Sequence, residues 1–395
     1  MKKNLGIVLS VLVFLAVIAG GYKSYQEKHG NHVSLSGMIG TGSNSGITSP
    51  SNPLSNPLSN PFSKASNSTA PLVKIIAGSA KFAFLKDPDL GNILDKQGMR
   101  LELIKSGAFE VDKVRAGEID AAWPASAGAA ADWAGNMPGS SSYPVFSTPL
   151  ALASWRSLMP MFEKNGLAKM SGPTHGDFDL EKALPLMVKG TRWNQLLDNT
   201  AFNVNKSFLI NTPDLRQGVT GGLYIATLAY ILNGHEVPQN AAKAEALAQT
   251  LTPLITRQGF QENTLAGPFE DYIGQGIGKA PLVLVYESQF FEAKRDGKIR
   301  DTHILLYPQP GLMLKHVLVG KTPAGKKLGE LLANDPEIQK IAAKYGFRTN
   351  NPALFAAQTK TLGMDAPELI NLAETPSPAI LDVMTQSIIN KIESK

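Results

Sequence analysis

The chain has 395 residues, which at about 150 residues per domain corresponds to two or three domains. Its 43% hydrophobic and 18% charged residues exclude wholesale disorder and a polytopic membrane protein. The absence of cysteine excludes a disulfide scaffold, a thiolate metal site, a cysteine nucleophile and a lipidated N-terminal cysteine. The net charge of +5 comes mainly from residues 1–71, which hold five lysines and one glutamate. The nearly neutral remainder argues against nucleic acid as a partner.

An apolar stretch near the N-terminus predicts export from the cytoplasm. Lys2 and Lys3 precede the uncharged run LGIVLSVLVFLAVIAGG at residues 5–21. Its 17 residues lie between the core of a signal peptide and a membrane-spanning helix. Residues 1–33 are therefore a signal peptide or a membrane anchor, and the sequence leaves both open.

The next segment, residues 34–71, is rich in Ser, Asn, Gly, Thr and Pro. It contains the repeat SNPLSNPLSNPFS at residues 51–63. Proline interrupts helices and sheets, and Ser and Asn solvate the backbone, so this segment is predicted to be a flexible linker. Such a spacer suits a body held off a membrane surface.

The first half of the body alternates strands with short helices. Strands are predicted at residues 72–78, 100–107 and 119–123. This alternation predicts an α/β fold with a largely parallel sheet. The β-rich run YPVFSTPLALASW at residues 143–155 is too long for a strand of one compact lobe and is predicted to cross between two parts of the body.

The second half repeats this organisation. Residues 207–232 read as a strand, a loop and a helix, and a second helix follows at 241–255. Further β segments are predicted at 280–288 and 303–320. Helices close the chain at about 323–333, 335–345 and 378–393.

Four loops that follow strands and open helices are candidate ligand sites, because backbone N–H groups converge there. The first runs from Gly78 and Ser79 to Lys81, the second from Ser106 and Gly107 to Ala108, the third from Trp123 to Ser126, and the fourth from Thr212 through Thr220 and Gly221 to Gly222. Each has a plainer interpretation: a serine caps a helix, a tryptophan ends a core strand, and paired glycines permit close packing.

Catalytic and metal-binding patterns are weak. The six histidines show no HExxH or paired metal spacing, and neither a GxSxG nor a GxxxxGK[ST] motif occurs. Asp177 and Asp179 follow His175 in a segment that is more typical of a polar turn than of a metal site. The sequence therefore predicts neither an enzyme nor a metal or cofactor site.

The order of these segments resembles the bacterial extracellular solute-binding proteins of the type II periplasmic-binding fold, especially the molybdate- and oxyanion-binding components of ABC transporters. The resemblance covers about residues 72–347 and rests on collinear strings rather than on a single motif. These strings are AGSAKFAFL (77–85), SGAFEVDKVRAGEIDAAWPAS (106–126), YPVFSTPLALASW (143–155), NTPDLRQGVTGGLYIATLAY (211–230), LVLVYESQF (282–290) and LLYPQPG (305–311).

The resemblance implies two α/β lobes that close on a solute about hinge segments at 143–155 and 305–318. Lobe 1 would comprise residues 72–150 plus 312–395, including the C-terminal helices, and lobe 2 residues 151–311. The residues expected at the cleft include the hydroxyl-bearing Ser79, Ser106, Ser126, Thr220 and Tyr286. The full set of candidate ligand-binding residues is Gly78, Ser79, Ser106, Gly107, Trp123, Ser126, Thr212, Thr220, Gly221, Tyr286 and Glu287.

The expected function is that of a periplasmic or otherwise extracytoplasmic receptor for a small polar solute, serving an inner-membrane permease. Neutral donors at helix starts favour an oxyanion, although Tyr286, Trp123 and Trp155 could stack on a sugar or another organic ligand. Where the family often has several serines before the second-lobe helix, the GVTGG loop offers only the Thr220 hydroxyl. Compared with the family, the chain also carries an insertion at about residues 157–205 and a C-terminal extension beyond residue 347. These departures keep open a second interpretation, a membrane-tethered interaction module of an envelope complex with a degenerate cleft.

Overall fold

The computed structural model describes residues 71–105, 119–216, 219–259 and 266–394. The predicted leader, the linker up to residue 70, and the loop that holds Ser106 and Gly107 lie outside these ranges. No helix among the described residues is both long and apolar enough to cross a membrane.

Parallel strands form the sheet of the first lobe. β1 (Leu72–Ala77) lies between β2 (Arg100–Lys105) and β3 (Ala121–Trp123) and is parallel to both. Alternate residues of β1 point to opposite faces. Val73 and Ile75 therefore join one core cluster, and Ile76 joins another on the opposite face.

Helices cover both faces of this sheet. Leu328 and Leu332 of α11 pack in the cluster of Val73, whereas Trp133 of α4 packs in the cluster of Ile76. The helices of this lobe are α2 (Phe82–Leu85), α3 (Pro88–Lys96), α4 (Ala127–Gly135), α11 (Pro323–Asn334) and α12 (Pro336–Lys344).

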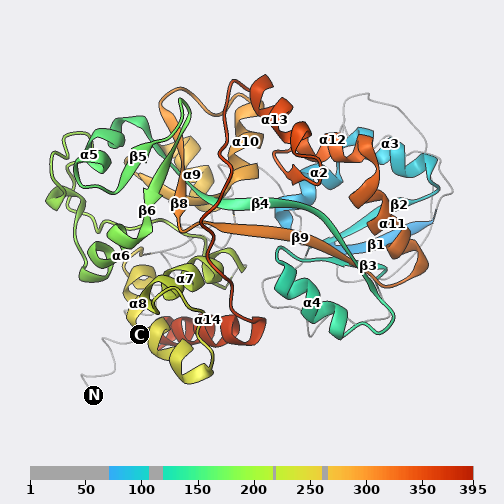
Figure 1. Cartoon of the computed structure of the whole chain (residues 1–395), viewed down its shortest axis with the longest axis horizontal. Helices are drawn as coiled ribbons and strands as arrows, with labels where there is room; N and C mark the ends of the chain where they lie inside the picture. The colour runs from blue at the N-terminus through green and yellow to red at the C-terminus, as the bar shows by residue number, and fades with distance from the viewer. Residues whose placement is uncertain (1–70, 106–118, 217–218, 260–265, 395) are drawn as a thin grey trace, which may run out of the picture. The chain divides into compact units, whose positions relative to one another are not determined.

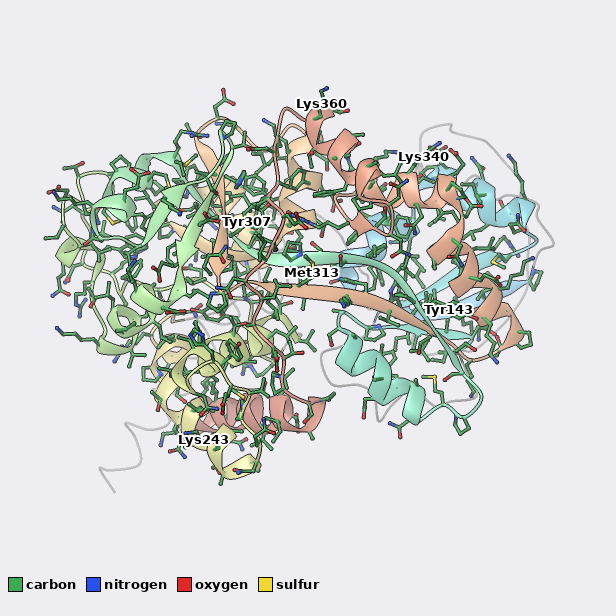
Figure 2. The ribbon with its side chains drawn as sticks, viewed as in Figure 1. Tyr143, Lys243, Tyr307, Met313, Lys340 and Lys360 are labelled. Carbon is green, nitrogen blue, oxygen red and sulfur yellow. The ribbon has the colours of Figure 1, made fainter. Side chains whose placement is uncertain are left out.

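Two long antiparallel strands connect the lobes. β4 (Ser141–Trp155) is a single strand of 15 residues, and its first part, from Ser141 to Leu150, pairs with β9 (Leu312–Gly320). Figure 2 shows Tyr143 in the first-lobe part of β4 and Met313 near the other end of the pair. The predicted crossing at 143–155 is thus formed by one continuous strand.

The remaining strands belong to the second lobe or flank β4. β7 (Leu282–Tyr286) and β8 (His303–Gln309) pair antiparallel with β4, as does the short β10 (Arg348–Thr349). β6 (His175–Asp179) is parallel to β8, and β5 (Ala168–Met170) closes that edge. The α/β class is confirmed: β1–β2, β1–β3 and β6–β8 are parallel pairs, whereas the crossing strands and the edge pair β5–β6 are antiparallel.

The insertion at 157–205 builds an integral part of the second lobe. It supplies β5, β6 and α6, whose Leu184 and Met187 are buried in the same core as Leu228 of α7. The helices of this lobe are α5 (Met159–Lys164), α6 (Leu180–Lys189), α7 (Val219–Leu232), α8 (Ala241–Thr256), α9 (Gly267–Gln275) and α10 (Glu287–Arg295).

The C-terminal extension returns to the second lobe. After α13 (Pro352–Thr361), Asn371 and Ala373 exchange backbone hydrogen bonds with Gly311, and α14 (Pro378–Glu393) packs against α7 and α8 (Figure 1). The sequence assigned all C-terminal helices to the first lobe, and α14 departs from that assignment because its Met384 and Ile388 are buried in the second-lobe core. The other lobe boundaries stay a prediction.

Candidate functional site

The first candidate loop turns directly after β1. Gly78 has a φ of −67°, and a Cβ built there would lie 3.5 Å from Lys81 Nζ, an ordinary contact. Ser79 opens a single 3-10 turn, Ser79–Lys81, in which the N–H of Lys81 donates to the Gly78 carbonyl at 3.1 Å. This tight turn directs the Lys81 side chain into the protein.

Lys81 is fully buried without a carboxylate partner among the described residues. Its Nζ donates to the Pro124 carbonyl at 3.4 Å and to Nδ1 of His316 at 3.3 Å, and it lies 5.5 Å from the centroid of the Trp123 ring. Burial disfavours the charged ammonium and lowers the pKa of Lys81 to about 7. The lysine is therefore poised between its charged and neutral forms near neutral pH.

His316 comes from β9 and is also fully buried. Burial lowers its pKa well below the ordinary value, and the positive charge of Lys81 lowers it further, so the imidazole is neutral. When Lys81 is protonated it donates to Nδ1, which places the imidazole proton on Nε2. Nε2 has no hydrogen-bond partner among the described residues. In this tautomer a buried N–H donor is left unused beside the buried lysine.

The second lobe reaches this cluster through Tyr286, at the end of β7. The Tyr286 ring meets that of His316 edge to face with centroids 6.3 Å apart. Its hydroxyl is hydrogen-bonded at 2.7 Å to Oγ1 of Thr220, in the first turn of α7. Burial raises the pKa of Tyr286, and the bond to Thr220 opposes that rise. We refer to Lys81, His316, Thr220 and Tyr286 as the hinge cluster.

Trp123 and Ser126 have structural contacts that match their plainer interpretations. Trp123 is fully buried and packs against Phe84 and Phe146, although it also lies beneath Lys81. Ser126 is the N-cap of α4, and its Oγ accepts from the Ala129 N–H at 3.2 Å. Their roles in ligand binding stay predictions.

The other described candidates lie in separate surroundings. A Cβ on Gly221 would come within 2.7 Å of Cδ2 of Leu215, so this glycine permits close packing. The N–H of Thr212 donates to Oε1 of Gln258 at 3.0 Å, at the edge of a different pocket. Glu287 is fully buried, and its carboxylate accepts from Arg348. The structure thus places Gly78 and Trp123 beside Lys81, and Tyr286 with its partner Thr220 beside His316, whereas Thr212, Gly221 and Glu287 have other neighbours.

Sequence reasoning placed Lys81 in the first candidate loop, but it selected neither Lys81 nor His316 as a ligand-binding residue. Lys81 stands between Ala80 and Phe82 in the quoted string AGSAKFAFL, where a lone lysine reads as a surface residue. His316 had a detectable signal, because the inward positions of β9 alternate as Leu312, Leu314, His316 and Leu318. A histidine at an inward position of a hinge strand marks a polar group in the core.

No protein-family model and no curated protein matches this sequence. Among solved structures, the GacH receptor of Streptomyces glaucescens GLA.O aligns with a TM-score of 0.51 at 10% identity, over 82% of this chain and 93% of that chain. The apo ferric ion-binding protein A of Pasteurella haemolytica gives 0.49 at 11% identity, over 82% and 96%. The sulfate-binding protein SubI of Mycobacterium tuberculosis gives 0.46 at 13%, over 75% and 92%.

The likeness to the GacH receptor concerns the fold. The parallel strands of each lobe, the two crossing strands and the helices on both faces define a two-lobe α/β protein. This chain has the fold of the type II periplasmic solute-binding proteins, as the resemblance implied.

Proposed function

We propose that this protein is an extracytoplasmic receptor that captures a small anionic solute, preferably an oxyanion, between its lobes for an ABC-type importer. The observation that carries the proposal is Lys81, a fully buried cation with no carboxylate partner among the described residues. It lies where the turn after β1, the hinge strand β9 and, through His316, Tyr286 of the second lobe meet.

The physical argument concerns charge compensation. A buried ammonium loses its hydration, and its pKa of about 7 reflects that loss. An anion bound beside Lys81 would restore the missing counter-charge and favour the protonated lysine. Within the hinge cluster, Nε2 of His316 and the one hydroxyl of the Thr220–Tyr286 pair that does not donate to the other can supply neutral donors. Such a set favours a compact anion over a neutral sugar.

The receptor role also agrees with the fold similarity to GacH, which has a TM-score of 0.51. GacH is described as a receptor whose structures include a complex with acarbose. The preference for an anion does not come from that protein and rests on Lys81 alone. The predicted leader at residues 1–33 supports a location outside the cytoplasm, as a cleaved signal or as an anchor.

No catalytic role, metal or cofactor is part of this proposal. Among the described residues, no group of three or more His, Asp or Glu side chains could hold a metal ion. Solute capture needs only non-covalent contacts and closure of the lobes. The partner implied by this role is a permease in the inner membrane.

Thermal unfolding of the full chain with sulfate, molybdate, phosphate and neutral sugars tests the proposal. A ligand at 100 times its dissociation constant stabilises the folded state by about 2.7 kcal/mol. We expect one anion to do so in the wild type and to lose this effect in Lys81→Met. Lys315→Met is the matched control, because Lys315 is the exposed neighbour of His316 on β9 and its loss removes the same charge. An equal anion response in Lys81→Met would refute the proposal.

The second candidate function is the membrane-tethered interaction module. It is favoured by the contact between Thr220 and Tyr286, which satisfy each other at 2.7 Å rather than presenting free hydroxyls. In that case no solute would shift the unfolding temperature, and the double variant Ser79→Ala/Thr220→Val would retain partner binding. Loss of solute binding in the double variant would instead support the receptor.

A further inference from the structure

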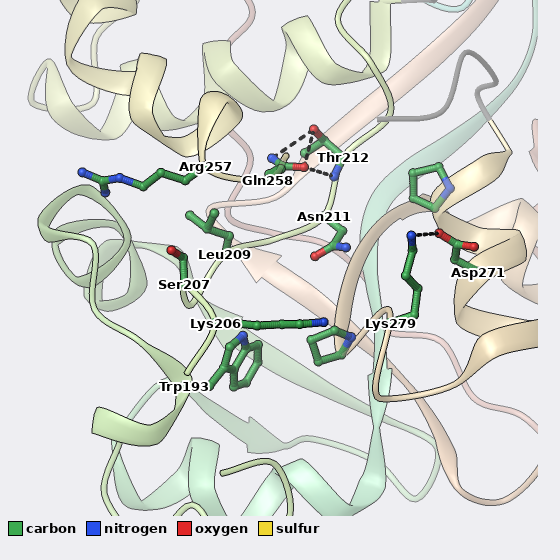
Figure 3. A pocket seen from close by; sticks show the side chains of 12 residues that line it. Trp193, Lys206, Ser207, Leu209, Asn211, Thr212, Arg257, Gln258, Asp271 and Lys279 are labelled. Atoms are coloured by element: carbon green, nitrogen blue, oxygen red, sulfur yellow. Dashed lines mark hydrogen bonds and ion pairs between the residues drawn. The ribbon is translucent and has the colours of Figure 1, made fainter. Parts of the chain in front are cut away.

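A pocket lies in the second lobe, away from the buried hinge cluster. It has a volume of about 360 Å³, within the range of about 300–1,000 Å³ typical of small-molecule pockets. We call it the side pocket; none of the hinge-cluster residues lines it (Figure 3). Its lining residues are Trp193, Lys206, Ser207, Leu209, Asn211, Thr212, Arg257, Gln258, Pro268, Asp271, Lys279 and Pro281.

An extended segment forms one wall of the side pocket. Asn211 bridges to Val283 of β7, and Ser207 bridges to Arg192. Side chains in extended chain alternate between two faces. Phe208 and Ile210 are accordingly buried in the core, whereas the partly exposed Ser207 and Asn211 line the pocket, together with Leu209, which is also part of the core. Alternation thus presents a hydroxyl and an amide to the same cavity.

The charges around the side pocket leave one ammonium uncompensated by a carboxylate. Lys279 lies 3.6 Å from Oδ2 of Asp271, which neutralises that pair. Arg257 caps α6 by donating to the carbonyls of Met187 and Val188. Lys206 donates to the Gly278 carbonyl at 2.9 Å and forms no ion pair with a described residue. Two of its three N–H donors therefore stay available to a ligand.

The remaining polar groups suit a hydroxylated molecule. The amide of Asn211 is half-buried and offers both a donor and an acceptor, and Figure 3 shows it between Leu209 and the Lys279–Asp271 pair. The hydroxyl of Ser207 lies on the same wall, whereas the ring of Trp193 is 1% exposed and packs in the core against Phe202 and Phe208. An ammonium, an amide and a hydroxyl together match a carboxylate that also carries hydroxyl groups.

We propose that the side pocket binds a small hydroxylated carboxylate of the size of a sugar acid, independently of the hinge cluster. Lys206 binds the carboxylate, and Asn211 and Ser207 bind hydroxyl groups. The inference goes beyond the proposed receptor function, because it assigns a second site with its own ligand class.

Calorimetric titration of the full chain with D-glucuronate tests this site, with D-glucose and acetate as probes of the ring and the carboxylate alone. We expect glucuronate to bind at least about tenfold more tightly than either fragment, since both halves of the pocket contribute. Lys206→Met and Asn211→Leu should each weaken glucuronate binding by about tenfold. Lys243→Met, which removes an exposed lysine of α8 outside the pocket, should leave it unchanged (Figure 2).

Three results would overturn the proposal: no binding of glucuronate, no effect of either pocket variant, or loss of glucuronate binding in Lys81→Met. The last result would move the ligand to the hinge cluster. Because Asn211 also takes part in backbone pairing, the thermal midpoint of each variant is measured first, and the exposed Lys206 provides the second, structurally milder variant. Conversely, if the wild type binds glucuronate but shows no stabilisation by any oxyanion, the receptor proposal is refuted and the side-pocket proposal stands.

Discussion

Arg348, which is mostly buried, and Lys81, which is fully buried, differ in whether a carboxylate neutralises their charge. The guanidinium of Arg348 meets the fully buried carboxylate of Glu287 through two parallel bonds of 2.7 and 2.6 Å. The Tyr307 hydroxyl donates to the same carboxylate at 2.6 Å, and Arg348 also donates to the Pro367 carbonyl at 3.0 Å. Lys81, by contrast, has only the Pro124 carbonyl and the imidazole of His316 within hydrogen-bond reach among the described residues.

The pKa of Arg348 is raised and the pKa of Lys81 is lowered, in agreement with this difference in partners. Burial acts to lower the pKa of Arg348, but hydrogen bonding and charge attraction from Glu287 outweigh it and raise that pKa. For Lys81 burial acts unopposed and lowers the pKa to about 7. One charge is compensated within the fold, whereas the other requires a counter-charge from outside. This contrast separates a structural ion pair from a candidate anion site.

The largest expected effect comes from breaking the compensated pair. Glu287→Gln leaves the mostly buried guanidinium of Arg348 without its counter-charge, so the free energy of unfolding should fall by about 4 kcal/mol. Urea denaturation monitored by tryptophan fluorescence measures this change.

The double variant Glu287→Gln/Arg348→Met is its control. Removing both charges should recover most of the lost stability, because no buried ion remains unpaired. If Glu287→Gln were as stable as the wild type, the Glu287–Arg348 pair would not stabilise the fold. The claimed difference between Arg348 and Lys81 would then be wrong.

The next effect is a rise in stability with pH that originates from Lys81. Its pKa is about 7 in the folded state, and the ordinary value of 10.5 applies to the unfolded chain, so between these values the unfolded chain binds more protons. The free energy of unfolding should therefore increase with pH across this window, by about 3 kcal/mol from pH 7.5 to pH 9.5. Below pH 7 Lys81 is protonated in both the folded and the unfolded state, so the free-energy cost of burying its charge no longer changes with pH. Urea titrations at several pH values provide the measurement.

Lys81→Met isolates this contribution from other titrating groups. The variant should lack the rise and be more stable than the wild type at pH 7 by roughly 2 kcal/mol, since a hydrophobic isostere replaces an unpaired ion. His316 acts in a different window: its lowered pKa makes the folded state less stable as pH falls below 6.5. Identical pH profiles for the variant and the wild type would show that Lys81 is compensated by another group.

The contrast between the two cations also explains what the sequence could and could not predict. The alternation of apolar residues, and the Gly, Ser and Pro residues at the ends of elements, predicted the α/β class, the crossing segment and the helix starts. These features depend on local sequence patterns. The environments of Lys81 and Glu287 depend on partners far along the chain, His316 and Arg348. No local pattern separates a lysine that turns inward from one on the surface. The assignment of α14 failed for the same reason, since its partners are α7 and α8.

The proposed anion should bind more weakly as pH rises. This tests whether the ligand supplies the counter-charge that Lys81, unlike Arg348, lacks within the fold. Only the protonated Lys81 supplies a counter-charge, and its protonated fraction in the free protein decreases above pH 7. The association constant should accordingly fall by up to about tenfold per pH unit above this value. Calorimetric titration with the anion identified by thermal unfolding, at pH 6.5, 7.5 and 8.5, tests this. A pH-independent affinity would mean that neutral donors alone hold the anion.

The smallest predicted effect concerns the neutral partners in the hinge cluster. Tyr286→Phe removes the hydroxyl that is hydrogen-bonded to Thr220 at 2.7 Å, so the free energy of unfolding should fall by about 1 kcal/mol. The double variant Tyr286→Phe/Thr220→Val should be nearly as stable as the wild type, because neither polar group is then left unpaired. If the hydroxyls act only on each other, anion binding is unchanged in both variants. If they turn to the anion when it binds, both variants weaken binding while retaining the pH dependence set by Lys81.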